Sequence, residues 1–230
     1  MSELIHKAFN LLTRKKIQVG FNDLSSPEPV SSEMGCDRGT PISHYYIEKF
    51  LKSRKDHIQG DVMEVASDSY IKRFGGDSVE SIEVLHVTPD NPKATIVGDL
   101  TKPESLPQEI VDCFVCTQTF NFISDVEKAV EGAYNVLKPG GVLLATTSGI
   151  SQISRYDMER WGHYWNLTTA SMENLFNPVF NNKVEIDSYG NVVAALALLQ
   201  GICVEDLPEP SLLDHNDPDY QVVITALAQK

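Results

Sequence analysis

Short apolar runs, each ending in a polar turn, follow one another between Gly60 and Asp99, and this series constrains the fold more than any other feature. The first run carries an acid, Glu64, near its carboxyl end. A second run at 81–87 and a third at 94–97 follow after turns of their own. This order is typical of the first half of an open α/β sheet, in which a ligand binds outside the carboxyl ends of the strands.

Four more strands are predicted further along the chain. The run Val-Asp-Cys-Phe-Val-Cys-Thr is continuously apolar, as expected for a strand that is covered on both faces. Helical patterns separate most of these strands, so we expect an α/β fold with a mainly parallel seven-stranded sheet and helices on both faces. The four later strands are expected at 111–117, 142–147, 184–189 and 220–227.

Helix starts and ends are marked by their own residues. We expect Thr40 to cap a helix that opens at Pro41, and Ser124 and Glu127 to form a capping box. The run 192–203 is apolar all round, which predicts a helix buried against the domain or a partner.

The N-terminal part differs from the rest. Apolar residues recur at helical spacing between Leu4 and Lys16, and 22–35 is rich in serine, proline and glutamate. We therefore divide the chain into an N-terminal helix and linker (1–35) and a single domain (36–230). The N-terminal helix and the helix at 192–203 are both candidate surfaces for a homodimer.

Charge and composition exclude several classes of function. The net charge is −13 and the isoelectric point about 4.8, which argues against nucleic acid or an anionic membrane as partner. No run approaches the ~20 apolar residues of a membrane helix. Cys113 and Cys116 should point to opposite faces of their strand, so they make a poor metal or redox pair. We expect a cytoplasmic protein that acts on a small-molecule substrate.

The segment 135–145 contains Leu-Lys-Pro-Gly-Gly between a helix and a strand. Together with Asp112, the run 118–122 and Gly98-Asp99-Leu100, it resembles the motifs of class I S-adenosylmethionine-dependent methyltransferases. The resemblance implies a Rossmann-like fold and S-adenosylmethionine as cofactor. Shorter runs, among them 38–41, are similar to a bacterial subgroup with carbohydrate-related gene neighbourhoods, which implies an oxygen of a sugar-like or secondary metabolite as acceptor.

The sequence departs from the family pattern at two places. The first motif normally has a glycine-rich turn after its acid, but Ala66, Ser67 and Asp68 follow here. An acid that normally binds the ribose hydroxyls is replaced by Thr88, with Asp90 nearby. The cofactor-binding residues that the resemblance implies are Glu64, Ala66, Ser67, Asp68, Thr88, Asp90, Gly98, Asp99, Leu100, Thr117 and Gln118.

A methyltransferase acting on a hydroxyl needs a base to take its proton. His163 is the first candidate, followed by Asp157, His44 and Tyr164, and no metal is expected. One alternative is a degenerate methyltransferase-fold protein with a non-catalytic binding role. Another is a protein that keeps the cofactor for a different reaction, such as a cyclisation. A dehydrogenase is disfavoured because G-x-G-x-x-G is absent.

Overall fold

A computed structural model describes residues 26–230 of the chain, and these residues build one seven-stranded sheet. The strand order is β3-β2-β1-β4-β5-β7-β6. Neighbouring strands from β3 to β5 run parallel, while β7 is antiparallel to both β5 and β6. The strands are β1 (Gly60–Val65), β2 (Val79–His86), β3 (Ile96–Val97), β4 (Val111–Thr117), β5 (Leu137–Ser148), β6 (Val184–Tyr189) and β7 (Val223–Gln229).

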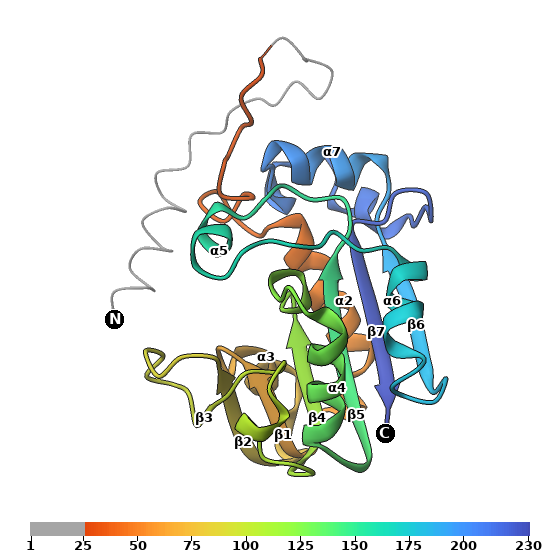
Figure 1. The fold of residues 1–230 in the computed structure, drawn as a ribbon. Coiled ribbons are helices and arrows are strands. Elements are labelled where there is room, and N and C mark those ends of the chain that lie inside the picture. The colour runs from red at the N-terminus through yellow and green to blue at the C-terminus, as the bar shows by residue number, and fades with distance from the viewer. Residues whose placement is uncertain (1–25) are drawn as a thin grey trace.

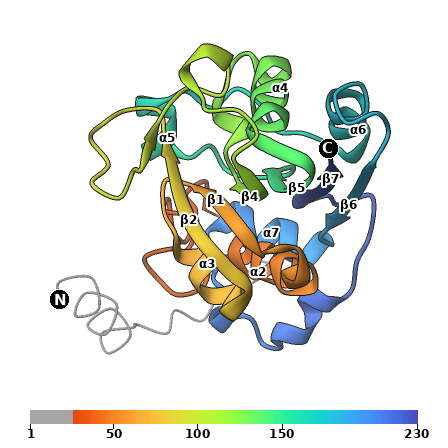
Figure 2. The same ribbon diagram turned by 90° about the horizontal axis from the view of Figure 1, so that it is seen from below.

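Helices cover both faces of this sheet (Figure 1). The view from below places α4 and α6 on one side and α2, α3 and α7 on the other (Figure 2). The predicted fold class, a mainly parallel seven-stranded sheet between helices, is confirmed. The helices are α2 (Ile42–Ser53), α3 (Ser69–Phe74), α4 (Val126–Val136), α5 (Arg155–Arg160), α6 (Thr169–Phe176) and α7 (Val192–Gln200), and the short helical turns include η4 (Phe120–Phe122) and η6 (Pro210–Asp214).

Strand β4 lies at the centre of the sheet and is apolar on both faces. Cys116 belongs to the core cluster beneath α4 and α6, whereas Cys113 belongs to the cluster beneath α2 and α7. Both thiols are fully buried, and burial raises the pKa of each to about 12. The prediction that these cysteines face opposite sides is confirmed.

The Leu-Lys-Pro-Gly-Gly run belongs to β5, which starts earlier than the sequence pattern predicts. The β4–β5 pairing runs Val111 to Leu137 and then Cys113 to Val142, so extra residues of β5 bulge out between these pairs. The bulge presents Lys138 Nζ at 2.6 Å from an Asp61 carboxylate oxygen and 2.8 Å from one of Asp112. This lysine therefore ties three neighbouring strands together at the end of the sheet opposite the cavity described below.

Two predicted caps are wrong. Pro41, not Thr40, is the N-cap of α2, and the Thr40 hydroxyl donates instead to Glu205. Helix α4 begins one residue later than a Ser124 cap requires, because the side chain of Asp125 accepts from the N–H of Lys128. Aspartate and serine are equally good N-caps, so the sequence alone does not show whether Ser124 or Asp125 caps the helix.

The helix predicted at 192–203, buried against the domain or a partner, is shorter than expected, and its inward face packs on the domain. Helix α7 ends at Gln200, where Gly201 takes a left-handed backbone with φ +66°. Its inward face is buried, but Leu196 on the outward face is 44% exposed. No helix within residues 26–230 is long and apolar enough to cross a membrane. The predicted N-terminal helix, Leu4 to Lys16, lies outside the described residues.

Candidate active site

A cavity of about 450 Å³ opens at the carboxyl ends of β1, β2, β3 and β4. The strand order reverses between β1 and β4, and such a switch point is where open α/β sheets bind ligands. In Figure 1 the chain around α5 lies above this end of the sheet. The lining residues come from the four strand ends (Val65, Ala66, Leu85, His86, Val87, Gly98, Asp99, Leu100, Thr101, Thr117, Gln118, Thr119), from the η4 segment (Phe122, Ile123, Ser124) and from the α5 segment (Asp157, Arg160, Trp161, Tyr164).

The acid at the end of β1 supports the loop from beneath. Glu64 is 2% exposed, and its carboxylate accepts from the N–H groups of Tyr70 and Ile71, both at 3.0 Å. The Ser67 hydroxyl donates to the same carboxylate at 3.0 Å. Burial raises the pKa of Glu64, and these hydrogen bonds oppose that shift. Glu64 therefore shapes the loop and the start of α3 without lining the cavity.

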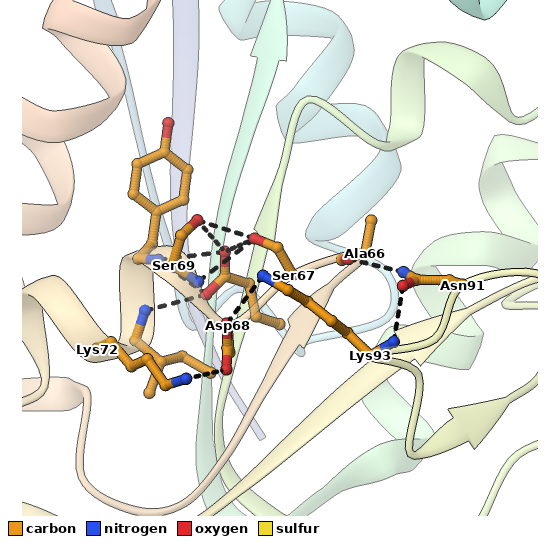
Figure 3. Close-up of polar contacts among 10 residues, drawn as sticks. Ala66, Ser67, Asp68, Ser69, Lys72, Asn91 and Lys93 are labelled. Atoms are coloured by element: carbon orange, nitrogen blue, oxygen red, sulfur yellow. Dashed lines mark hydrogen bonds and ion pairs between the residues drawn. The ribbon is translucent and has the colours of Figure 1, made fainter. Parts of the chain in front are cut away.

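Ala66 adopts the backbone conformation that a glycine would normally supply. Its φ is +64°, in the left-handed region that side chains with a Cβ disfavour. Two hydrogen bonds fix it there, because its N–H donates to the Leu85 carbonyl at 2.9 Å and its carbonyl accepts from Asn91 Nδ2 at 2.7 Å. Figure 3 shows the contact with Asn91. The loop thus keeps a glycine-like turn although the motif has no glycine.

Asp68 forms ion pairs with two lysines and does not line the cavity. Its carboxylate pairs with Lys72 and lies 3.5 Å from Lys93 Nζ, as Figure 3 illustrates. The hydrogen bond from Lys72 is the main cause of a lowered Asp68 pKa. Ser67 and Asp68 therefore stabilise the loop, and neither lines the cavity.

The end of β2 presents an imidazole to the cavity. His86 and Val87 line it, whereas Thr88 and Asp90 do not. The Thr88 N–H lies 3.2 Å from His86 Nδ1, and the Trp161 ring meets the imidazole edge-on with centroids 5.8 Å apart. Thr88 thus orients His86 from behind. The sequence pattern points two residues too far along because β2 ends at His86.

Asp99 supplies an aspartate carboxylate to the cavity just after β3. Its Oδ1 accepts from the N–H of Thr101 at 2.9 Å and from the Thr101 hydroxyl at 2.8 Å, and Lys102 Nζ lies 3.1 Å from Oδ2. Burial acts to raise the Asp99 pKa, but these contacts outweigh it and the pKa is lowered. The side chain is therefore an ionised acceptor at neutral pH.

The end of β4 contributes Thr117 and Gln118 to the cavity lining, and their predicted role in cofactor binding stays a prediction. Gln118 is a second cavity residue with a left-handed backbone, at φ +48°. Its side-chain oxygen accepts from the Ser148 hydroxyl at 2.6 Å, which fixes the amide against β5. Strained backbone that its surroundings hold in place is typical of binding sites.

The α5 segment brings two of the four predicted catalytic residues to the cavity, namely Asp157 and Tyr164. The ring of His163 instead packs edge-on against Phe122, with centroids 5.1 Å apart, and does not line the cavity. His44 is exposed on α2 and lies outside the cavity too. The roles assigned to these residues stay predictions.

Several lining residues were missed by sequence reasoning. His86, Leu85 and Val87 were hidden by the misplaced end of β2. Phe122 and Ile123 lie five and six residues after the end of β4, so their position close to a strand end was the signal that could have found them. Among residues 26–230, no group of three or more histidine, cysteine, aspartate or glutamate side chains is arranged to hold a metal ion.

Comparison with known proteins relates part of the chain to a family of domains. Residues 59–145, from just before β1 into β5, match the sequence model of a methyltransferase domain. A comparison with curated protein sequences found no match.

Solved structures share the fold at low sequence identity. A SAM-dependent methyltransferase from Archaeoglobus fulgidus is 8% identical, with 81% of this chain and 94% of that chain covered and a TM-score of 0.53. An S-adenosylmethionine-dependent methyltransferase from Mesorhizobium loti is 15% identical, with coverages of 82% and 98% and a TM-score of 0.53. The [4+2]-cyclase SpnF is 14% identical, with coverages of 98% and 94% and a TM-score of 0.54.

At such identities a structural likeness establishes the fold, and the family match adds the kind of domain. Residues 59–145 therefore match a methyltransferase domain, and the described chain has the Rossmann-like fold of the S-adenosylmethionine-dependent methyltransferases it resembles.

Proposed function

We propose that the protein binds S-adenosylmethionine across the carboxyl ends of β1 to β4 and transfers its methyl group to an oxygen of a small sugar-like or secondary metabolite. The observation that carries the proposal is the cavity at the switch point, with the ionised Asp99 at one strand end and the left-handed Ala66 at another. Its volume of about 450 Å³ is within the range of small-molecule sites.

The residues at the strand ends suit this cofactor. Asp99 is an acceptor for the amino group of an adenine ring, and Val87 and Leu100 offer apolar surface to the ring faces. His86 lines the cavity at the end of β2, two residues before the Thr88 that the resemblance aligns with a ribose-binding acid, and an imidazole can bond a hydroxyl as donor or acceptor. Because Ala66 keeps the turn of a glycine, its backbone can approach the ligand closely.

The acceptor is expected between η4 and the α5 segment. There the cavity is lined by the aromatic rings of Phe122, Trp161 and Tyr164 and by two charged side chains, Asp157 and Arg160. Aromatic rings with polar edges combine apolar contact with hydrogen bonding, which suits a small polyhydroxylated or aromatic metabolite.

The bound cofactor supplies a methyl group on a positively charged sulfur, which an oxygen nucleophile displaces. The chain's part is to hold the acceptor in line and to take its proton. We assign the proton to Asp157, which lines the cavity and whose carboxylate is held by the Ser154 hydroxyl. His163 is the second candidate, since its Nδ1 lies 3.4 Å from the N–H of Ser154 on the same segment.

The test is release of S-adenosylhomocysteine over a panel of sugar, polyol and secondary-metabolite acceptors. With an acceptor in hand, Asp157→Asn should lower kcat by about 10²–10⁴ while cofactor affinity is unchanged, because a general base acts only on the chemical step. Asp125→Asn, in the exposed cap of α4, is the matched control. Full activity of Asp157→Asn would refute the assignment. Cofactor binding without turnover on any acceptor would favour the non-catalytic alternative.

A further inference from the structure

The outward face of α7 carries an uncovered apolar row. Val192, Leu196 and Leu199 recur at helical spacing, and they are 46%, 44% and 43% exposed. The opposite face of the helix is buried in the core through Ala194, Ala195, Ala197 and Leu198.

Exposed apolar side chains at each end of the helix lengthen this row. Leu212 (38% exposed) lies at the start of α7, where its carbonyl accepts from Asn191, the N-cap of the helix. Ile153 (47% exposed) lies at the other end, since the neighbouring Gln152 side chain donates to the Leu199 carbonyl at 2.7 Å. We call Val192, Leu196, Leu199, Leu212 and Ile153 the α7 patch.

An acidic segment lies alongside the α7 patch. Residues 204–219 include η6, which packs against α7, and contain no lysine or arginine. Within this segment Glu209 and Asp219 are exposed. The acids of the segment are Glu205, Asp206, Glu209, Asp214, Asp217 and Asp219.

Residues 1–25 have the opposite character in sequence. They hold four lysine or arginine residues and two acids, in a chain whose net charge is −13. Their apolar residues, Leu4, Ile5, Ala8, Phe9, Leu11 and Leu12, recur at helical spacing, which predicts one apolar face. The basic residues are Lys7, Arg14, Lys15 and Lys16.

A residue near the start of the described chain, Ser31, lies close to the α7 patch. The N–H of Ser31 donates to the Gln200 carbonyl at 3.1 Å, and the Ser31 carbonyl accepts from Gln152 Nε2 at 3.3 Å. Ser31, six residues after residue 25, therefore lies beside the last turn of α7. A helix of 13 residues, as predicted for 4–16, is about 20 Å long, enough to cover the roughly 14 Å of the nine-residue α7.

We propose that residues 4–16 dock as an amphipathic helix on the α7 patch of their own chain, with their basic side chains toward the segment 204–219. Apolar burial supplies the attraction, and the opposite charges set the orientation. Ile153 precedes α5, which lines the cavity, so the docked helix would also hold the base of the α5 segment in place.

Trypsin cleavage of the full-length protein at Arg14 to Lys16, followed by mass spectrometry, tests the docking. The wild-type protein should be cut there at least about tenfold more slowly than a synthetic peptide of residues 1–25. Leu196→Asp and, separately, Leu199→Asp should abolish most of this protection, because a charge is then placed in the apolar contact. Val97→Asp is the matched control, since Val97 is 49% exposed on β3 at the far edge of the sheet.

Both α7 variants replace exposed side chains, so they should fold, and circular dichroism verifies this. Equal cleavage of wild type, both α7 variants and the free peptide would overturn the proposal. Light scattering should show a monomer. Protection that accompanies a dimer mass and disappears on dilution would mean that a second copy covers the patch, which overturns docking within one chain.

Discussion

Replacing Ala66 by valine should lower the free energy of unfolding by about 1–3 kcal/mol, because a β-branched residue is strained in left-handed backbone. The φ of +64° is the structural basis for this prediction. The loop cannot easily escape the strain, since the N–H of Ala66 is bonded to Leu85 and its carbonyl to Asn91. Each such bond contributes roughly 1 kcal/mol, so turning the residue to negative φ gains nothing.

Ala66→Gly should behave differently. Glycine removes about 1 kcal/mol of left-handed strain but adds a similar amount of entropy to the unfolded chain, so the two changes nearly cancel. Ala170, an exposed residue in helix α6, is the matched control. At position 170 glycine should lower the free energy of unfolding by about 1 kcal/mol and valine by less, because helix propensity determines both losses.

Urea denaturation of the four variants measures these differences. We expect valine to be more destabilising than glycine at position 66, and glycine to be more destabilising than valine at position 170. Titration with S-adenosylmethionine should in addition show tighter or unchanged binding by Ala66→Gly and weaker binding by Ala66→Val, whose methyl groups enter the cavity. The reasoning is refuted if Ala66→Val is as stable as the wild type, or if both sites give the same order.

Two further predictions concern packing and charge. Gly132→Ala should destabilise the protein by about 3 kcal/mol or more, because its Cβ would lie 2.0 Å from the Leu100 carbonyl oxygen, and calorimetric unfolding measures the loss. Arg38→Met should cost about 3 kcal/mol at neutral pH, since Arg38 Nε lies 2.9 Å from Asp206 and both side chains are largely buried. Burial acts to raise the Asp206 pKa, but the bond from Arg38 and those of Cys203 outweigh it, so the pKa is lowered from 3.8. The pair's contribution is thus present above pH 3.8 and lost as pH falls through the lowered pKa, and urea titrations at neutral and acid pH should show the variant and wild type converging.

The sheet could be predicted from sequence because its strands follow local patterns. The continuous apolar run of β4 and the alternation with helices are sufficient for the fold class. The ends of helices and strands were harder to predict, because neighbouring residues can each serve as the cap or the first residue of an element. Asp125 replaces Ser124 as the cap of α4, and the bulge at Lys138 extends β5 past the turn-like Pro-Gly-Gly.

Cavity-lining residues could be predicted from sequence where they directly follow a strand in a recognisable motif. They were missed where the end of a strand or the packing of a ring determines which residue faces the cavity. Gly98, Asp99 and Leu100 line the cavity as expected from their place after β3. The sequence has no glycine after Glu64 and does not show which residue would take the left-handed turn, whereas in the structure two hydrogen bonds hold Ala66 in it. His86 escaped notice because one strand end was misplaced, and no local pattern shows that His163 packs behind Phe122.

The most direct test of the account is calorimetric titration of the purified protein with S-adenosylmethionine and with S-adenosylhomocysteine. We expect one site with micromolar affinity for both ligands. Asp99→Ala should weaken both by about 10- to 150-fold, the 1.5–3 kcal/mol of a hydrogen bond to a charged group. Asp125→Ala, outside the cavity, should leave both affinities unchanged. No detectable binding of either ligand by the wild-type protein would contradict the proposed function and leave the fold with a different task.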